Sequence, residues 1–191
     1  MRSLTAFSIL ALSLVVGCNE KDPDSNSSSS ASAKSGAGAT VSVKRLDFPG
    51  TEEGAQALVA ELVKPGADVA SLSASLRPDP KDYAAVFEGD AASKVEKSHS
   101  KMWDDGKAVF KPKEGQTATL VSSQTTDKMK SGDTGNCPGG YKDAAAQMKA
   151  GLTVYCFKFV QPGESLGMAF DGLVHVNGHW AIFPKPFAAL K

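Results

Sequence analysis

The chain lacks the charge pattern of a nucleic-acid-binding protein. Its 21 Lys and Arg residues balance its 21 Asp and Glu residues, so the formal net charge is zero. No basic stripe provides the electrostatic footprint that binding to phosphates requires, and no polybasic segment would hold the chain to a membrane surface. We therefore expect no nucleic-acid partner, and any membrane attachment must have another source.

Long apolar runs are also scarce, and the one at the start of the chain is short. Arg2 supplies a positive charge, and residues 4–16 carry no charged side chain. A membrane-spanning helix needs roughly 20 apolar residues. A positive start followed by about 7–15 apolar residues is instead typical of a secretory signal. We therefore predict that residues 1–17 are a signal peptide.

The predicted signal peptide leads into Val15-Val16-Gly17-Cys18. This sequence resembles the lipobox of bacterial prolipoproteins, in which branched and small residues precede an obligatory cysteine; Val15 departs from the commoner Leu. The resemblance implies cleavage before Cys18, a diacylglycerol thioether on its sulfur, and N-acylation, for example with palmitate. Several acyl chains on one residue anchor a protein stably. The alternative is an ordinary signal peptide with an incidental cysteine.

The residue after the predicted lipid site is Asn19. In proteobacterial lipoproteins, Asp at this position favours retention in the inner membrane. The resemblance therefore implies an outer-membrane location, facing either the periplasm or the cell surface, rather than an inner-membrane one.

Two segments follow the signal peptide. Residues 18–42 are rich in Ser, Ala and Gly and contain almost no large apolar side chain. Such a stretch cannot offset its ordering entropy, so we predict a lipidated cysteine followed by a disordered tether. Residues 43–191 have the usual length of one domain with one core.

Two cysteines remain after Cys18 is assigned to lipid, namely Cys137 and Cys156. An even pair outside the cytoplasm is typical of a disulfide, and we predict that these two residues are bonded. The alternative is two unpaired thiols, with Cys156 buried on a strand and Cys137 in a Gly-rich loop.

Helix signals occupy the first half of the domain. Thr51 precedes an apolar stripe with i, i+3, i+4 spacing, which ends at Pro65-Gly66. Asp68 is an N-cap signal for a second helix, and Asp79-Pro80 has proline at the first position of a third. A fourth helix is predicted from about residue 91 to 103.

Strand signals occupy the second half. We predict strands over 117–125, 152–160, 166–176 and 179–183, with a loop-like stretch at 127–140 and a short helix over 141–148. Pro162-Gly163 predicts a type II turn, and Asn177-Gly178 predicts a tight hairpin. The order is helices, a strand, a helix and a three-stranded meander. The predicted fold class is α+β, with N-terminal helices packed on a curved antiparallel sheet that ends in a β-meander.

The segment from Asp171 to Trp180, DGLVHVNGHW, resembles the last hairpin of NTF2-like (SnoaL-like) domains. In that superfamily, helices close one end of a curved antiparallel sheet, so the resemblance implies a cone with a pocket. It covers about the last third of the chain. It implies no particular chemistry, because that fold hosts enzymes, binding modules and assembly domains alike.

The sequence Gly163-Glu164-Ser165-Leu166-Gly167 matches the nucleophile elbow of α/β-hydrolases, and Asp171 and His175 follow in the right order. An elbow needs a helix after its serine, whereas a strand is predicted after Ser165. On an extended strand, Ser165 and His175 would lie over ~30 Å apart. We therefore expect a turn here and predict no catalytic triad.

His175 and His179 have zinc-like spacing. A two-residue hairpin at Asn177-Gly178 pairs His175 with Trp180, which places the two histidines on opposite faces of the sheet. No cysteine or carboxylate is predicted to converge on them. We therefore expect no metal site, and we identify no cofactor motif.

His99 lies on an apolar helix stripe beside Trp103. It is either a general base in a pocket or a histidine at the edge of the core, and we favour the second interpretation. The candidate ligand-binding residues are His99, Tyr155 and His175. Their convergence with a carboxylate would favour an enzyme.

The functional prediction is a non-catalytic binding or assembly module of the cell envelope, held to the membrane by its lipid. Its expected partners are an envelope protein, peptidoglycan or a small apolar ligand. The alternative is a small periplasmic hydrolase or isomerase with its site in an NTF2-like cavity.

Overall fold

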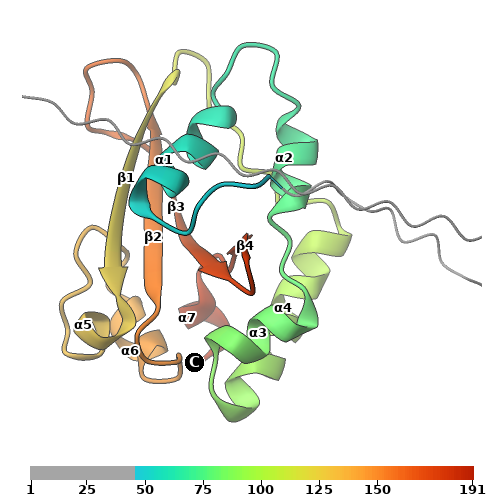
Figure 1. Ribbon diagram of the computed structural model, residues 1–191, viewed down its shortest axis with the longest axis vertical. Helices are drawn as coiled ribbons and strands as arrows, with labels where there is room; N and C mark the ends of the chain where they lie inside the picture. The colour runs from blue at the N-terminus through green and yellow to red at the C-terminus, as the bar shows by residue number, and fades with distance from the viewer. Residues whose placement is uncertain (1–45) are drawn as a thin grey trace, which may run out of the picture. The chain divides into compact units, whose positions relative to one another are not determined.

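The computed structural model describes residues 46–191 (Figure 1). The predicted signal peptide, the lipid site at Cys18 and the tether lie outside the described residues. In chain order the elements are α1 (Glu52–Glu61), α2 (Val69–Ser75), α3 (Pro80–Val86), α4 (Gly89–Asp104), β1 (Ala118–Thr125), α5 (Thr126–Lys130), α6 (Tyr141–Ala145), β2 (Thr153–Val160), β3 (Gly167–Val176), β4 (His179–Ile182) and α7 (Pro186–Ala189).

Polar side chains at the N-caps determine where the first three helices begin. Thr51 Oγ1 accepts a hydrogen bond from Gly54 N at 3.2 Å, and Asp68 Oδ1 accepts one from Ser71 N at 3.1 Å. Asp79 caps α3 in a capping box. Each cap satisfies a backbone amide that has no partner inside its helix. The three predicted helix starts are confirmed.

The four strands form one antiparallel sheet in the order β1-β2-β3-β4. This arrangement confirms the α+β class. Strands β2, β3 and β4 form the predicted three-stranded meander. The separately predicted strand β1 joins it by pairing with β2 along its whole length, from Ala118↔Val160 to Thr125↔Thr153. The long connection between β1 and β2 contains α5 and α6. The two strands are nevertheless neighbours in the sheet.

The prediction of a loop over the whole of residues 127–140 is wrong, because α5 begins this stretch. Its N-cap is Thr125, whose side chain accepts a hydrogen bond from Lys128 N. Only Thr126 and Met129 of this helix are buried, so its sequence has no apolar periodicity to reveal it. The short helix α7 near the C-terminus was likewise not predicted.

Helices cover both faces of the sheet, and each face has its own core. Successive residues of a strand point to opposite faces. Tyr155, Phe157 and Trp180 pack with Leu58 of α1, and we refer to their side as the α1 face. The opposite side, here the α6 face, joins Val154, Cys156, Val174 and Ala181 to Tyr83 of α3 and to Tyr141 and Ala145 of α6. In Figure 1, α5 and α6 lie at the end of the sheet where β1 finishes, and α3 and α4 lie beyond β4.

Candidate functional site

A groove of about 510 Å³ opens on the α6 face of the sheet. It is lined by residues 120–122 of β1, 156–158 of β2, 169–171 of β3, 136–138 of the loop before α6, and Ser165. Small-molecule sites in proteins typically enclose about 300–1,000 Å³. We name this feature the sheet-face groove.

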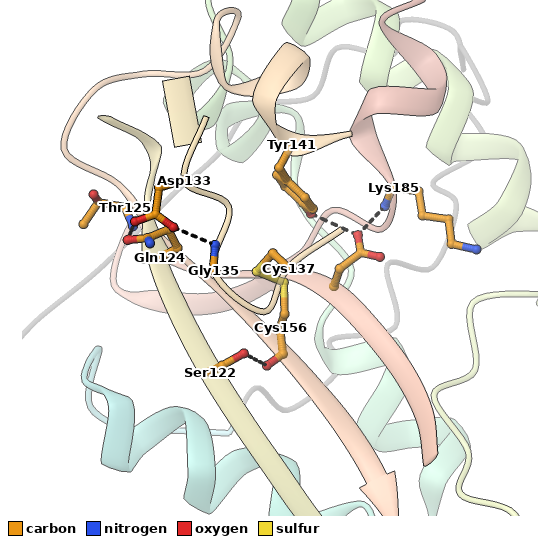
Figure 2. Close-up of a disulfide and its surroundings, with 10 residues drawn as sticks. Ser122, Gln124, Thr125, Asp133, Gly135, Cys137, Tyr141, Cys156 and Lys185 are labelled. Atoms are coloured by element: carbon orange, nitrogen blue, oxygen red, sulfur yellow. Dashed lines mark hydrogen bonds between the residues drawn. A yellow bond between two sulfur atoms is a disulfide. The ribbon is translucent and has the colours of Figure 1, made fainter. Parts of the chain in front are cut away.

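A disulfide forms one wall of the sheet-face groove. Cys137 and Cys156 are bonded, with their Cα atoms 5.5 Å apart, which is the pairing that the sequence predicted. Figure 2 shows the bond between the loop that carries Cys137 and the strand that carries Cys156. Both cysteines are buried. The bond therefore holds residues 136–138 against the middle of β2. This wall of the groove is already in place before any ligand binds.

A β-bulge in β3 shapes the end of the groove. Phe157 pairs with Phe170, but Tyr155 pairs with Leu173, so β3 has one extra residue at this point. Gly172 has a φ of +84°, and a Cβ there would lie 2.1 Å from the Phe183 carbonyl oxygen. Only glycine tolerates both conditions. The bulge separates Asp171, which lines the groove, from the regular pairing with β4 that follows.

Asp171 places a nearly buried carboxylate at this end, since only 5% of the residue is exposed. Its Oδ1 accepts hydrogen bonds from Tyr141 Oη at 3.0 Å and from Lys185 N at 2.7 Å. Figure 2 shows Tyr141 and Lys185 approaching the same carboxylate. No donor among residues 46–191 bonds to Oδ2. One oxygen is therefore fixed by the fold, and the other has no protein donor.

Burial sets the acidity of this pair. Desolvation raises the pKa of Asp171, and the hydrogen bonds from Lys185 N and Tyr141 Oη oppose that rise. Desolvation, followed by the charge of Asp171, raises the pKa of Tyr141 well above its ordinary value. Tyr141 therefore stays protonated at neutral pH and remains a hydrogen-bond donor to Asp171.

Lys158 brings a positive charge to the same face. It pairs with Leu120 of β1 and with Ala169 of β3, and all three residues line the groove. Its amine forms no hydrogen bond or ion pair with any residue of the described part of the chain. Asp171 lies two residues beyond Ala169. The Cα atoms of Lys158 and Asp171 are therefore about 8 Å apart, from a rise of about 3.3 Å per residue and a strand spacing of about 4.8 Å.

Comparison with known proteins gives no assignment for the sheet-face groove. No family model, curated protein or solved structure matches this chain. Between residues 46 and 191, no helix has both the length and the apolar character needed to cross a bilayer. The function of the groove therefore has to be derived from its own side chains.

The structure divides the three predicted ligand-binding residues between the two cores. Tyr155 and His175 both contact the Trp180 ring on the α1 face, with centroid distances of 5.3 and 5.1 Å. His99 instead contacts the ring of Tyr83, 5.9 Å away, which belongs to the core of the α6 face. None of the three lines the sheet-face groove.

The surroundings of these three residues explain their titration. Burial lowers the pKa of His99 to about 4, against a smaller opposite effect of the Pro184 backbone, and its Nδ1 has no hydrogen-bond partner. Burial, followed by the charge of His179, lowers the pKa of His175. Burial, followed by the charges of Glu52 and Glu53, raises the pKa of Tyr155.

Ser165 lines the groove but does not lie in a nucleophile elbow. Glu164 N donates to Gln161 O at 3.0 Å, and Gly163 has a φ of +84°, as the third residue of a type II turn requires. Strand β3 then begins at Gly167. The predicted turn is confirmed. His175 packs on Trp180 on the α1 face, so it lies across the sheet from the groove that Ser165 lines.

His179 has carboxylate neighbours that the sequence analysis missed. Asp79, Asp82 and His179 each offer a ligand atom within 4.8 Å of the others, so the expectation that no carboxylate converges on this histidine is wrong. The oxygens of Asp82 already accept hydrogen bonds, from Asn177 Nδ2 at 2.7 Å, Asp79 N at 2.7 Å and His179 Nε2 at 3.0 Å. The cluster joins the tip of the β3–β4 hairpin to the start of α3.

Proposed function

We propose that the chain is a lipid-anchored lipoprotein of the cell envelope whose domain binds a small ligand in the sheet-face groove without catalysing a reaction. One observation carries the binding part of this proposal. Asp171 and Lys158 line the groove, and one carboxylate oxygen of Asp171 and the amine of Lys158 have no partner among the described residues. A concave site with a few convergent polar groups is the usual form of a ligand site.

Two further observations support an envelope location. The lipobox resemblance at Cys18 implies export and lipid attachment, with Asn19 favouring the outer membrane. The Cys137–Cys156 disulfide is typical of proteins that fold outside the cytoplasm. The resemblance of residues 171–180 to NTF2-like domains stays part of the proposal, because it implies a pocket against a sheet.

The groove favours a small ligand over the other partners that we considered. Its volume of about 510 Å³ suits a small molecule or a short segment of a larger one. Three strands and a disulfide fix its walls, so a ligand would not have to order them on binding. A peptide of peptidoglycan or the end of an envelope protein would enter it only as a short segment.

One observation favours the enzyme alternative, a small periplasmic hydrolase or isomerase. Asp171 is a buried acid with a raised pKa in a groove, which is a recognised feature of catalytic sites. The test is to incubate the purified protein with the molecule that it carries. A molecule recovered unchanged supports binding, and a chemically altered one supports the enzyme.

The test of binding is native mass spectrometry. The mature chain, residues 18–191, carries Cys18→Ala and is secreted behind an ordinary signal peptide in place of residues 1–17, so that it is cleaved without lipidation and can be purified from the periplasm. We expect a bound small molecule that is absent from an Ala169→Phe variant, because phenylalanine at this exposed groove position would fill the site. Binding in the groove would be contradicted if the protein carries no small molecule, or if the parent and the Ala169→Phe variant carry the same amount of it.

A further inference from the structure

We infer that the sheet-face groove recognises a short zwitterionic peptide, with the peptide ammonium at Asp171 and its carboxylate at Lys158. This inference deepens the proposed function and rests on the groove being a binding site. It adds the chemical class of the ligand and the role of each charged side chain.

The case for an ammonium begins with Asp171. The residue is only 5% exposed, and Lys185 and Tyr141 approach one of its two oxygens. Asp171 forms no ion pair with any cation among the described residues. Lys185 contributes only the smallest of the effects that lower the pKa of Asp171, and Oδ2 is not among the buried side-chain atoms that lack a partner. Oδ2 is therefore open to the groove, where a positively charged ligand group could reach it. An ammonium carries three donors, of which Oδ2 can accept one.

The case for a carboxylate comes from Lys158. Lys158 lines the groove from β2, and its amine has no partner within residues 46–191. Asp171 and Lys158 carry opposite charges on one face of the sheet, and their Cα atoms are about 8 Å apart. The two side chains nevertheless form no ion pair with each other. A ligand with both charges would satisfy the two residues together, whereas a singly charged ligand would leave one unsatisfied.

The separation of the charges sets the length of the ligand. An extended chain spans at most about 3.3–3.6 Å per residue, so a dipeptide covers about 7 Å and a tripeptide about 10 Å. These lengths match the spacing of Asp171 and Lys158, given the flexible lysine side chain.

An apolar side chain on the ligand has a matching surface in the groove. Leu120 is 44% exposed and is one of three large hydrophobic residues exposed in the described part of the chain. It pairs with Lys158 and therefore borders the proposed carboxylate position. A ligand side chain over Leu120 would bury apolar surface that the protein alone leaves in water.

The experiment is an NMR titration of the unlipidated mature chain with three probes. The first is the dipeptide alanyl-leucine, the second is N-acetyl-alanyl-leucine, which lacks the ammonium, and the third is alanyl-leucine amide, which lacks the carboxylate. We expect saturable amide shifts for residues 120–122, 156–158 and 169–171 with alanyl-leucine. Each blocked peptide should bind at least tenfold more weakly, because each loses one charge-assisted hydrogen bond.

Two variants assign the charges to their residues. Asp171→Asn keeps an acceptor for Tyr141 and Lys185, so the fold should survive while alanyl-leucine binds at least tenfold more weakly. Lys158→Met keeps the aliphatic chain and should weaken binding of alanyl-leucine but not of its amide. The matched controls are the exposed residues Asp143→Asn and Lys128→Met, which should bind like the parent.

The outcomes separate this inference from the proposed function. Equal binding of all three probes, shifts outside the groove, or unchanged binding by Lys158→Met and Asp171→Asn would overturn the inference. If circular dichroism shows that Asp171→Asn does not fold, the test of the inference rests on the blocked peptides and on Lys158→Met. If native mass spectrometry finds a natural ligand that the Ala169→Phe variant lacks, the groove remains a binding site even when the peptide inference fails. If that variant retains the ligand, both the proposed function and this inference are contradicted.

Discussion

Trp180 joins the start of the described chain to the sheet. It is 2% exposed, its Nε1 donates to Phe48 O at 3.0 Å, and the rings of Tyr155 and His175 pack against it. Trp180→Ala should lower the free energy of unfolding by about 3–5 kcal/mol, as large-to-small changes in a core do. Urea denaturation measures this loss. A loss near zero would mean that Trp180 is exposed in solution and belongs to a recognition surface.

His99 gives the domain a dependence on pH. Its pKa is about 4 in the folded state, below the ordinary value of 6.5. As pH falls through 6.5 the unfolded chain takes up the proton first, so stability is complete above about pH 6.5 and declines towards pH 4. His99→Leu should remove this component, which amounts to about 3 kcal/mol, and should flatten the curve of stability against pH in that window.

The comparison with His99→Leu has to be made against the parent chain at each pH. Asp171, whose pKa is raised, contributes with the opposite sign in an overlapping range, because its folded state binds the proton more readily. Urea denaturation of both proteins between pH 4 and pH 7 isolates the histidine. Parallel curves for the two proteins would show that His99 is not buried as the structure describes.

At the scale of elements, Asp82 connects α3 to the β3–β4 hairpin. It is fully buried and accepts hydrogen bonds from Asp79 N, Asn177 Nδ2 and His179 Nε2. Asp82→Ala removes the acceptor of three hydrogen bonds and the buried partner of His179, so we expect the free energy of unfolding to fall by about 3 kcal/mol. The exposed Asp90→Ala is the matched control and should lose under about 1 kcal/mol. Equal losses in chemical denaturation would contradict a connecting role for Asp82.

The disulfide holds the connection between β1 and β2 to the sheet. Cys137 and Cys156 are 19 residues apart, and closing a loop of that size contributes about 3 kcal/mol in the chain-entropy model. The Cys137→Ala/Cys156→Ala double variant should lose about that much stability, and a reducing agent should weaken the parent but not the variant. A parent chain insensitive to reductant would show that the bond is absent.

Local signals in the sequence were sufficient to predict most of these elements. Thr51, Asp68 and Asp79 predicted helix starts because an N-cap acts within three residues of itself. Asn177-Gly178 predicted the hairpin and its register because both residues need positive φ, and they have it. Helix α5 was missed because its sequence is polar, with Thr126 and Met129 as its only buried residues.

The sheet-face groove could not be predicted in the same way. It depends on the register of three strands and on a loop that a disulfide holds in place, and these are long-range features. One signal was present in the sequence. A glycine inside a strand, here Gly172, often marks a β-bulge, and bulges are over-represented next to active sites. The three favoured residues, His99, Tyr155 and His175, were chosen by type and lie elsewhere.

The whole molecule is proposed to consist of a lipid anchor, a tether and a ligand-binding domain. The anchor and the tether are predictions from residues 1–42 alone, and the domain is described by the structure. If Cys18 carries lipid, a Cys18→Ala chain secreted behind an ordinary signal peptide in place of residues 1–17 should leave the membrane fraction and appear in the soluble periplasm. The groove would then be presented at the end of the tether, where a ligand in the periplasm or at the surface could reach it.

The intact mass of the full-length protein, extracted with detergent from the membrane fraction of the expressing bacterium, tests this account most directly. We predict a chain that begins at Cys18, carries a diacylglycerol and an acyl group, and is short of the two hydrogens of the Cys137–Cys156 bond. A mass that includes residues 1–17, or a cleaved chain without lipid, would contradict the lipoprotein assignment on which the proposed location rests.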